Sequence, residues 1–138
     1  MACPNCGGDM LVSPIPEVVR QYLPDDRPGA SICRRCLTVT PEDEPPETYP
    51  DFSIISEAFP AEKVEAAILV SILALIDSLA LNRQEIEALA SMAEARGIDV
   101  LLFLDRLVVS GRIQPHFDAD RRRSQLEQLL ERQDFKRE

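Results

Sequence analysis

The sequence CPNCG at residues 3–7 and the sequence CRRC at residues 33–36 decide how the N-terminal part of this chain folds. They contain the only four cysteines of the 138 residues. Two residues between thiolates allow a tight turn to direct both sulfur atoms at one metal ion, and two such turns supply the tetrahedral four-sulfur set that zinc prefers. The spacing therefore predicts one structural zinc ion, bound by Cys3, Cys6, Cys33 and Cys36.

The four cysteines also allow roles other than a structural zinc site. Disulfides need an oxidising compartment, and Cys3 comes before any apolar segment of a secretory signal could form. An iron site is an alternative, because a Cys-Pro-x-Cys-Gly turn also occurs in rubredoxins, although the aromatic residues that shield iron there are missing around these turns. A redox-active dithiol is a further alternative. A catalytic zinc is disfavoured because four thiolates leave no open position for water.

Residues 1–40 are predicted to form a zinc ribbon. Short strands are expected at 10–12, 30–32 and 37–39, with one or two helical turns at 17–23 and a turn-rich loop at 24–29. Such a piece is too small to bury an adequate core, so the metal must contribute much of its folding energy. Leu37, rather than glycine, follows the second cysteine pair, so the two turns need not be equivalent.

Residues 41–60 are predicted to form an acidic, proline-rich linker. Prolines favour extended chain, and like charges extend it further. Its apolar side chains, which we expect to dock onto the following helices, are Tyr49, Phe52, Ile54, Ile55 and Phe59. The acidic side chains from 41 to 62, where no lysine or arginine occurs, are Glu42, Asp43, Glu44, Glu47, Asp51, Glu57 and Glu62.

Residues 61–138 are predicted to form a bundle of about four helices, which makes the fold α+β and mostly α. The stretch from Ala61 to Leu81 is apolar almost all round, as expected for a central helix or for one at a homodimer interface. Asn82 is expected to cap the next helix in a capping-box pair with Glu85. Gly97 is expected to end that helix, and Asp99 to cap the one after it.

The last two predicted helices are separated by a short connection. Gly111 ends the first of them, and Pro115-His116-Phe117 forms the connection. Asp118 or Asp120 is expected to cap the last helix. His116 is the only histidine, and we interpret it as a loop residue packed at a helix end, because the zinc already has four thiolate ligands.

The charge is acidic and poor in lysine. The chain has 24 acids and 15 bases, for a net charge of −9, and only Lys63 and Lys136 are lysines. This pattern is typical of cytoplasmic proteins of salt-accumulating archaea, although high-GC coding explains the arginine preference equally well. In molar salt the Debye length shrinks to about 3 Å, which weakens attraction to nucleic acid. No apolar run is long enough to span a bilayer.

Two arginine groups allow a nucleic-acid hypothesis. Arg34 and Arg35 lie between two cysteines, where they offset thiolate charge or contact phosphate. Arg121-Arg122-Arg123 cannot form one flat patch, because successive helix residues point about 100° apart, and the acids of the next turns favour a salt-bridged helix. Residues 82–113 have helix–turn–helix spacing, but the second helix is too apolar to lie in a major groove.

The chain resembles the haloarchaeal small CPxCG-related zinc-finger proteins, and most closely an uncharacterised haloarchaeal zinc-ribbon domain family. The matching stretches are 3–7, 22–24, 33–36, 102–107, 115–118 and 120–123. The resemblance implies the four zinc ligands and a regulatory or adaptor role without catalysis.

The resulting functional hypothesis is a cytoplasmic, non-enzymatic zinc protein that binds another protein. A nucleic-acid-binding regulator of transcription or translation, which uses the ribbon and the arginine groups, is the first alternative. A rubredoxin-like iron electron carrier is the second. No Ser-His-Asp arrangement, phosphate-binding glycine loop or HExxH motif is present.

Overall fold

The computed structural model is an α+β fold and describes residues 2–23, 26–109 and 111–137, with side chains through residue 132. Pro24 and Asp25 of the predicted loop lie outside this range. In chain order, the elements are β1 (Met10–Pro14), α1 (Glu17–Arg20), β2 (Gly29–Cys33), β3 (Val39–Glu42), a 3-10 helix (Phe52–Ile54), α2 (Lys63–Leu75), a second 3-10 helix (Ile76–Ser78), α3 (Arg83–Ala95), α4 (Val100–Val109) and α5 (Ala119–Arg137).

The three strands form one antiparallel sheet with β2 in the centre. Met10 of β1 lies opposite Cys33 of β2, and Ile32 of β2 lies opposite Val39 of β3. All five residues of β2 are buried. The central strand therefore leads directly from the interior of the protein to the third cysteine.

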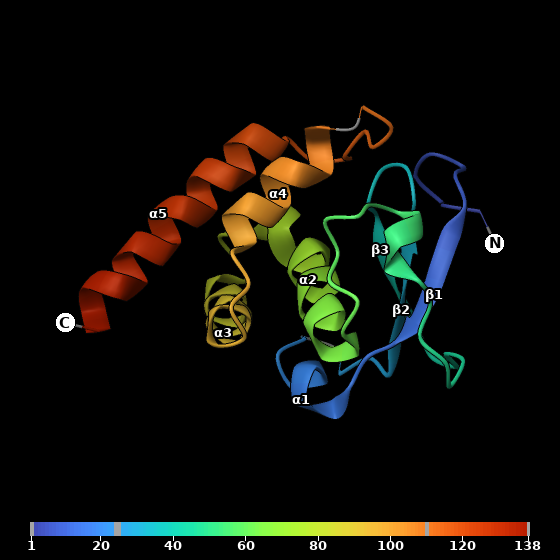
Figure 1. The fold of residues 1–138 in the computed structure, drawn as a ribbon, viewed down its shortest axis with the longest axis horizontal. Helices are drawn as coiled ribbons and strands as arrows, with labels where there is room; N and C mark the ends of the chain where they lie inside the picture. The colour runs from blue at the N-terminus through green and yellow to red at the C-terminus, as the bar shows by residue number, and fades with distance from the viewer. Residues whose placement is uncertain (1, 24–25, 110, 138) are drawn as a thin grey trace.

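Helix α2 lies between the sheet and helices α3, α4 and α5 (Figure 1). It contacts α1 and β3 on one side and α3 on the other, and α5 packs on α3 and α4. Every residue from Ala66 to Leu73 is buried, so α2 is a central helix, one of the two placements predicted for the apolar stretch 61–81; a homodimer interface stays a prediction. The stretch is not one continuous α-helix, because a 3-10 turn follows Leu75.

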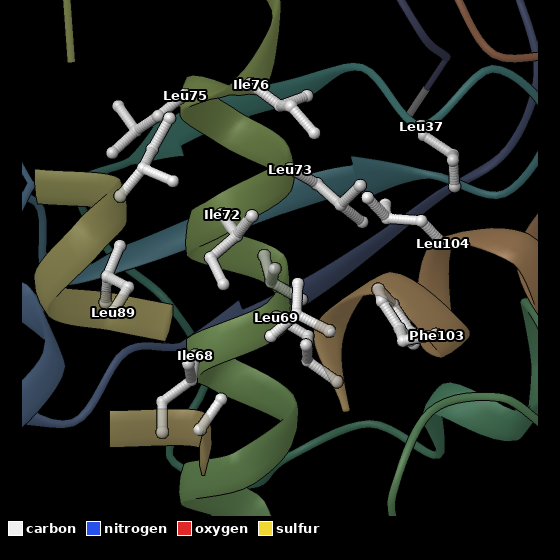
Figure 2. Packing of buried hydrophobic residues seen from close by; sticks show 14 of the residues in the cluster. Leu37, Ile68, Leu69, Ile72, Leu73, Leu75, Ile76, Leu89, Phe103 and Leu104 are labelled. Carbon is white, nitrogen blue, oxygen red and sulfur yellow. The ribbon is translucent and has the colours of Figure 1, made fainter. Parts of the chain in front are cut away.

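One cluster of buried side chains extends over the sheet, the acidic proline-rich segment and the helices. Leu37, directly after the last cysteine, points toward Leu73 of α2 and Leu104 of α4 (Figure 2), and Leu37 is fully buried. Burial of this kind contributes about 1.5–3 kcal/mol for each large aliphatic side chain. The core thus joins residues on both sides of the predicted boundaries at 40 and 60; the division into separate units there stays a prediction.

The predicted linker is partly ordered by this core. Its first residues complete β3, and Phe52, Ile55 and Phe59 are buried. The rings of Phe52 and Phe59 stack at 5.4 Å between centroids, and Phe59 packs edge-on against Phe103 of α4 at 5.0 Å. The expected docking of these aromatic side chains is confirmed, whereas Ile54 is exposed.

Glycine is required where this segment folds back over the sheet. A Cβ atom at Gly29 would lie 2.4 Å from the Cβ atom of Pro45. Such a distance is far below van der Waals contact, so only glycine allows Pro45 to pack this closely on the end of β2.

The ends of α3, α4 and α5 follow the expected local signals. Gly97 adopts a left-handed conformation with φ of 80°, and the Ile98 N–H donates to the Ala93 carbonyl at 2.9 Å, which closes α3 in a Schellman motif. The Asp99 carboxylate accepts from the Leu102 N–H at 3.0 Å, and the Asp118 carboxylate accepts from the Arg121 N–H at 3.1 Å. Asp118 rather than Asp120 is therefore the cap of α5.

The predicted capping pair of Asn82 and Glu85 is wrong. Asn82 precedes α3, but its backbone is not in the extended conformation that capping residues adopt, and its side chain makes no bond to α3. The Asn82 amide donates to the Ser78 carbonyl at 3.0 Å. The Ser78 carbonyl also accepts the backbone N–H groups of Leu81 and Asn82, so the Asn82 side chain adds a further bond at the end of the preceding helical segment.

Candidate metal centre

The four cysteine sulfur atoms form one compact cluster. All four Sγ atoms lie within 4.8 Å of one another. The Sγ atoms of Cys3 and Cys36 are 3.7 Å apart, and those of Cys6 and Cys33 are 3.5 Å apart. A tetrahedron of sulfurs at about 2.3 Å from zinc has edges of about 3.8 Å. The cluster therefore has the size of a tetrahedral metal site.

Both cysteine turns have the same backbone geometry. The Gly7 N–H donates to the Cys3 carbonyl at 2.9 Å, and the Leu37 N–H donates to the Cys33 carbonyl at 3.2 Å. Gly7 has φ of 79° and Leu37 has φ of 65°, so both residues adopt the left-handed conformation. We expected that leucine in place of glycine would allow a different turn, and for the backbone this is wrong. Leu37 adopts the left-handed conformation, which only glycine adopts without strain.

Backbone N–H groups point at the first sulfur of each turn. The Asn5 N–H donates to the Cys3 Sγ at 3.3 Å, and the N–H groups of Arg35 and Cys36 both donate to the Cys33 Sγ at 3.4 Å. Donors of this kind stabilise thiolates and fix the directions of the sulfur atoms. They are a consequence of the tight turn and need no particular side chain.

Two side chains that the sequence does not mark as functional complete the surroundings of Cys36. The Thr38 hydroxyl lies 3.0 Å from the Cys36 Sγ, and the Asn5 amide nitrogen lies 3.9 Å from it. The Asn5 amide also donates to the Thr38 hydroxyl at 3.3 Å. The signal for them in the sequence is their position, since Asn5 lies inside the first turn and Thr38 follows the second by two residues.

The thiols of Cys3 and Cys33, two of the three buried cysteines, have different pKa values in the metal-free protein. Burial acts to raise the pKa of Cys3, but the backbone N–H groups of Cys6 and Asn5 outweigh it and lower that pKa to about 6. Burial raises the pKa of Cys33 to about 12. A metal ion would have to displace a proton from Cys33, which makes binding coupled to proton release.

The first turn and the second turn meet at Gly8. A Cβ atom at Gly8 would lie 3.3 Å from both the Arg35 Cβ and the Cys33 Sγ. The main chain also joins the turns, because the Arg34 N–H donates to the Asp9 carbonyl at 2.9 Å. The Arg34 side chain lies 3.8 Å from the Asp9 carboxylate, so one of the two arginines between the cysteines has an acidic partner within the protein.

A segment far away in the sequence also contacts the second turn. The Gln114 N–H donates to the Arg35 carbonyl at 2.7 Å, and the His116 N–H donates to the Cys36 carbonyl at 2.9 Å. The His116 side chain is exposed and lies edge-on to the Phe117 ring. His116 does lie in a loop, as predicted, but its exposed side chain is not packed into a helix end. Its main-chain bond to the second cysteine turn has no signal in the sequence.

Two of the three consecutive arginines at the start of α5 are paired with acids. The Arg123 guanidinium contacts Asp105 of α4 at 2.7 Å and Glu127 of α5 at 2.6 Å. These partners raise the pKa of Arg123. Arg122 lies 3.3 Å from Asp77, and Arg121 is exposed. The predicted salt-bridged helix is confirmed for Arg123 and Glu127.

Comparison with known families covers both the cysteine cluster and the helices. A family profile matches residues 2–130. The chain belongs to the family of unknown function DUF6276. The DUF6276 match spans all four cysteines and most of α5, so the cysteine-bearing sheet and the helices belong to one family unit. No curated protein and no solved structure matches this DUF6276 chain.

The described helices of this DUF6276 protein do not have the character of membrane spans. Within residues 2–23, 26–109 and 111–137, none of them combines the length and the apolar character that a bilayer crossing requires.

Proposed function

We propose that the protein binds one zinc ion through Cys3, Cys6, Cys33 and Cys36, and that this ion is structural. The observation that carries the proposal is the convergence of four sulfur atoms within 4.8 Å of one another. Four thiolates fill a tetrahedral coordination sphere and leave no position for water or substrate. The ion would therefore hold the two turns together, and the protein would act without catalysing a reaction.

Elemental analysis and native mass spectrometry of the full chain test this proposal directly. We expect one zinc per chain, no visible absorbance, and loss of the metal when Cys33 is changed to serine. A coloured protein that contains one iron would support the electron-carrier alternative instead. A reduced, folded protein that takes up neither metal would contradict both, and would leave a redox-active dithiol as the role of the quartet.

We further propose that the protein is a cytoplasmic interaction or regulatory module that binds another protein. The support comes from the outer face of α4, where the exposed side chains of Leu102, Arg106 and Val109 follow helical spacing. Val109 is 81% exposed. A groove of about 280 Å³ lies between α4 and the segment around the first 3-10 helix, Phe52–Ile54. Its lining includes Ser56, Arg106 and Val109.

A pair of matched substitutions tests the α4 face. Val109→Asp places a charge on this face, whereas Leu81→Asp places one on an equally prominent apolar side chain, 86% exposed, between α2 and α3. Each variant is used as bait in native, high-salt lysate, followed by mass spectrometry. We expect a partner that is retained by the unchanged protein and by Leu81→Asp but lost with Val109→Asp. Equal retention by all three proteins would exclude this face.

The haloarchaeal origin and the nucleic-acid alternative have different support. The resemblance and the acidic, lysine-poor composition favour a salt-accumulating archaeon as the source. Nucleic-acid binding is weakened by the pairing of Arg34, Arg122 and Arg123 with acids, which leaves less positive charge for phosphates. Binding of duplex DNA or RNA by the zinc-loaded protein in low salt, lost on Arg35→Ala or Arg121→Ala, would restore that alternative.

A further inference from the structure

The connection between α4 and α5 contacts two parts of the protein: the core and the second cysteine turn, residues 33–37. Ile113 and Phe117 are buried in the core, while Gln114 and His116 expose their side chains. The backbone N–H groups of Gln114 and His116 point the other way, at the carbonyls of Arg35 and Cys36, with distances of 2.7 and 2.9 Å. Two side chains of this short segment therefore anchor it in the core. Two of its backbone N–H groups bind it to the second cysteine turn.

The two carbonyls that accept these bonds belong to the second cysteine turn itself. Cys36 is one of the four cysteines, and Arg35 is its neighbour between the ligands. Their positions depend on the direction in which the Cys36 sulfur is held. A metal ion that fixes Cys33 and Cys36 would fix these carbonyls as acceptors. Four unlinked thiols would hold the turn less firmly, so the bonds from Gln114 and His116 would open more often.

The other end of the connection determines where α5 begins. Phe117 is followed by Asp118, whose carboxylate caps α5 through the Arg121 N–H. Arg122 and Arg123, one turn further on, join α5 to Asp77 after α2 and to Asp105 of α4. The path from the Cys36 carbonyl to the first turn of α5 is therefore only a few bonded or hydrogen-bonded steps long.

We propose that the α4–α5 connection is a positioning segment of the metal centre, so that metal binding and the docking of α5 are coupled. The inference rests on the proposed binding of zinc and extends the site beyond its four ligands. Coupling of this kind is reciprocal. Zinc would order Gln114, His116 and the start of α5, and the bonds from Gln114 and His116 would in turn increase the affinity for zinc.

Hydrogen exchange of the full chain, with zinc and after removal of zinc by a chelator under reducing conditions, tests the first half of the coupling. The amides of Gln114, His116 and Arg121 should exchange at least about fivefold faster without zinc, a ratio typical of the loss of one net hydrogen bond. The amides in the middle of α3 are the control and should accelerate less, because loss of zinc reaches them only through the lower stability of the whole fold. Unchanged exchange at Gln114 and His116, in protein that demonstrably binds zinc, would overturn the inference.

A pair of proline substitutions tests the reciprocal half. His116→Pro removes the N–H that donates to Cys36 and should lower the affinity for zinc about fivefold, as measured by competition with a chromophoric chelator. Ala119→Pro is the matched control, because proline is tolerated at the first position of a helix, where the N–H has no helical partner. Its affinity should equal that of the unchanged protein.

The outcomes separate this inference from the proposed function. An unchanged protein that binds no zinc would contradict the proposed function. Zinc binding that is equal in the unchanged protein and in His116→Pro would overturn the coupling alone. Should His116→Pro fail to fold, Gln114→Pro removes the other N–H and provides the same comparison, and the exchange experiment needs no variant.

Discussion

The turn at residues 3–7 and the turn at residues 33–37 have the same backbone and different surroundings. In the first, Cys6 is exposed, and a Cβ atom at Gly7 would have no atom within 4 Å. In the second, Leu37 is fully buried among side chains of α2 and α4 (Figure 2). The Cys-x-x-Cys spacing favours the same tight turn in both places, whereas only the tertiary structure determines how firmly each is anchored.

Leu37 shows the balance of forces in the second turn. A left-handed conformation costs a residue with a side chain about 1–2 kcal/mol. Full burial of a leucine side chain contributes about 1.5–3 kcal/mol. Burial is therefore large enough to offset the strain, and leucine can occupy a position that the first turn gives to glycine.

Removal of zinc should have the largest effect and should act on the two turns unequally. Structural zinc contributes on the order of 10–16 kcal/mol in finger peptides, so the thermal midpoint should fall steeply. In protein stripped of zinc, the Gly7 amide should exchange at nearly the rate of an unfolded chain. The Leu37 amide should keep part of its protection, because the core still holds its side chain. Equal exchange of the two amides, measured by NMR, would show that the core does not anchor the second turn more firmly than the first.

The Leu37→Gly substitution should have the next largest effect. It relieves the left-handed strain but leaves a cavity, and a buried leucine truncated to alanine costs about 2.7–5 kcal/mol. We expect the free energy of unfolding, measured with denaturant in excess zinc, to fall by about 2–4 kcal/mol. A gain in stability would show that strain, rather than burial, dominates at this position.

The Gly7→Ala substitution is the counterpart in the first turn. Open space surrounds the position, so only the left-handed backbone opposes the new side chain. The free energy of unfolding should fall by about 1 kcal/mol. Gly7→Asn is the control and should be nearly neutral, because asparagine tolerates this conformation better than alanine. A large loss for both variants would mean that the first turn is more closely packed than the second.

The Asp105→Asn substitution tests an anchor that lies away from both turns. It weakens the ion pair of Asp105 with Arg123 between α4 and α5, which is partly exposed. The thermal midpoint should fall slightly in dilute buffer, and the difference should shrink at about 1 M salt, where the Debye length is about 3 Å. A fall in midpoint that is independent of salt would contradict an electrostatic role. Zinc stoichiometry should remain one.

The smallest expected effect concerns Glu62 at the start of α2. The Glu65 N–H donates to the Glu62 carboxylate at 2.7 Å and holds the pKa of Glu62 below its ordinary value. A lowered pKa in the folded state gives stability that is present above the unfolded pKa and lost as pH falls through the folded pKa. The stability of Glu62→Gln should therefore depend less on pH in this acidic range, with exchange at both turns unchanged. An identical pH profile would show that the carboxylate contributes nothing.

The sequence predicted those features that depend on local chemistry. The two Cys-x-x-Cys pairs indicated the ligand cluster, Gly97 indicated the end of α3, and Asp99 indicated the start of α4. The apolar stretch 61–81 indicated a central helix because it lacks a polar face. Asn82 was misinterpreted because its side chain can cap in either direction, and the choice depended on the geometry of the preceding 3-10 turn.

The sequence by itself determined that four thiolates can meet around one ion, because two residues of spacing force each pair into a tight turn. Only the tertiary structure decided that Leu37 would bury its side chain beside α2 and α4, and that Gln114 and His116 would donate to the second turn. Those contacts join residues far apart in the chain through main-chain groups that every residue possesses. Such bonds leave no mark on residue identity, so no pattern in the sequence could reveal them.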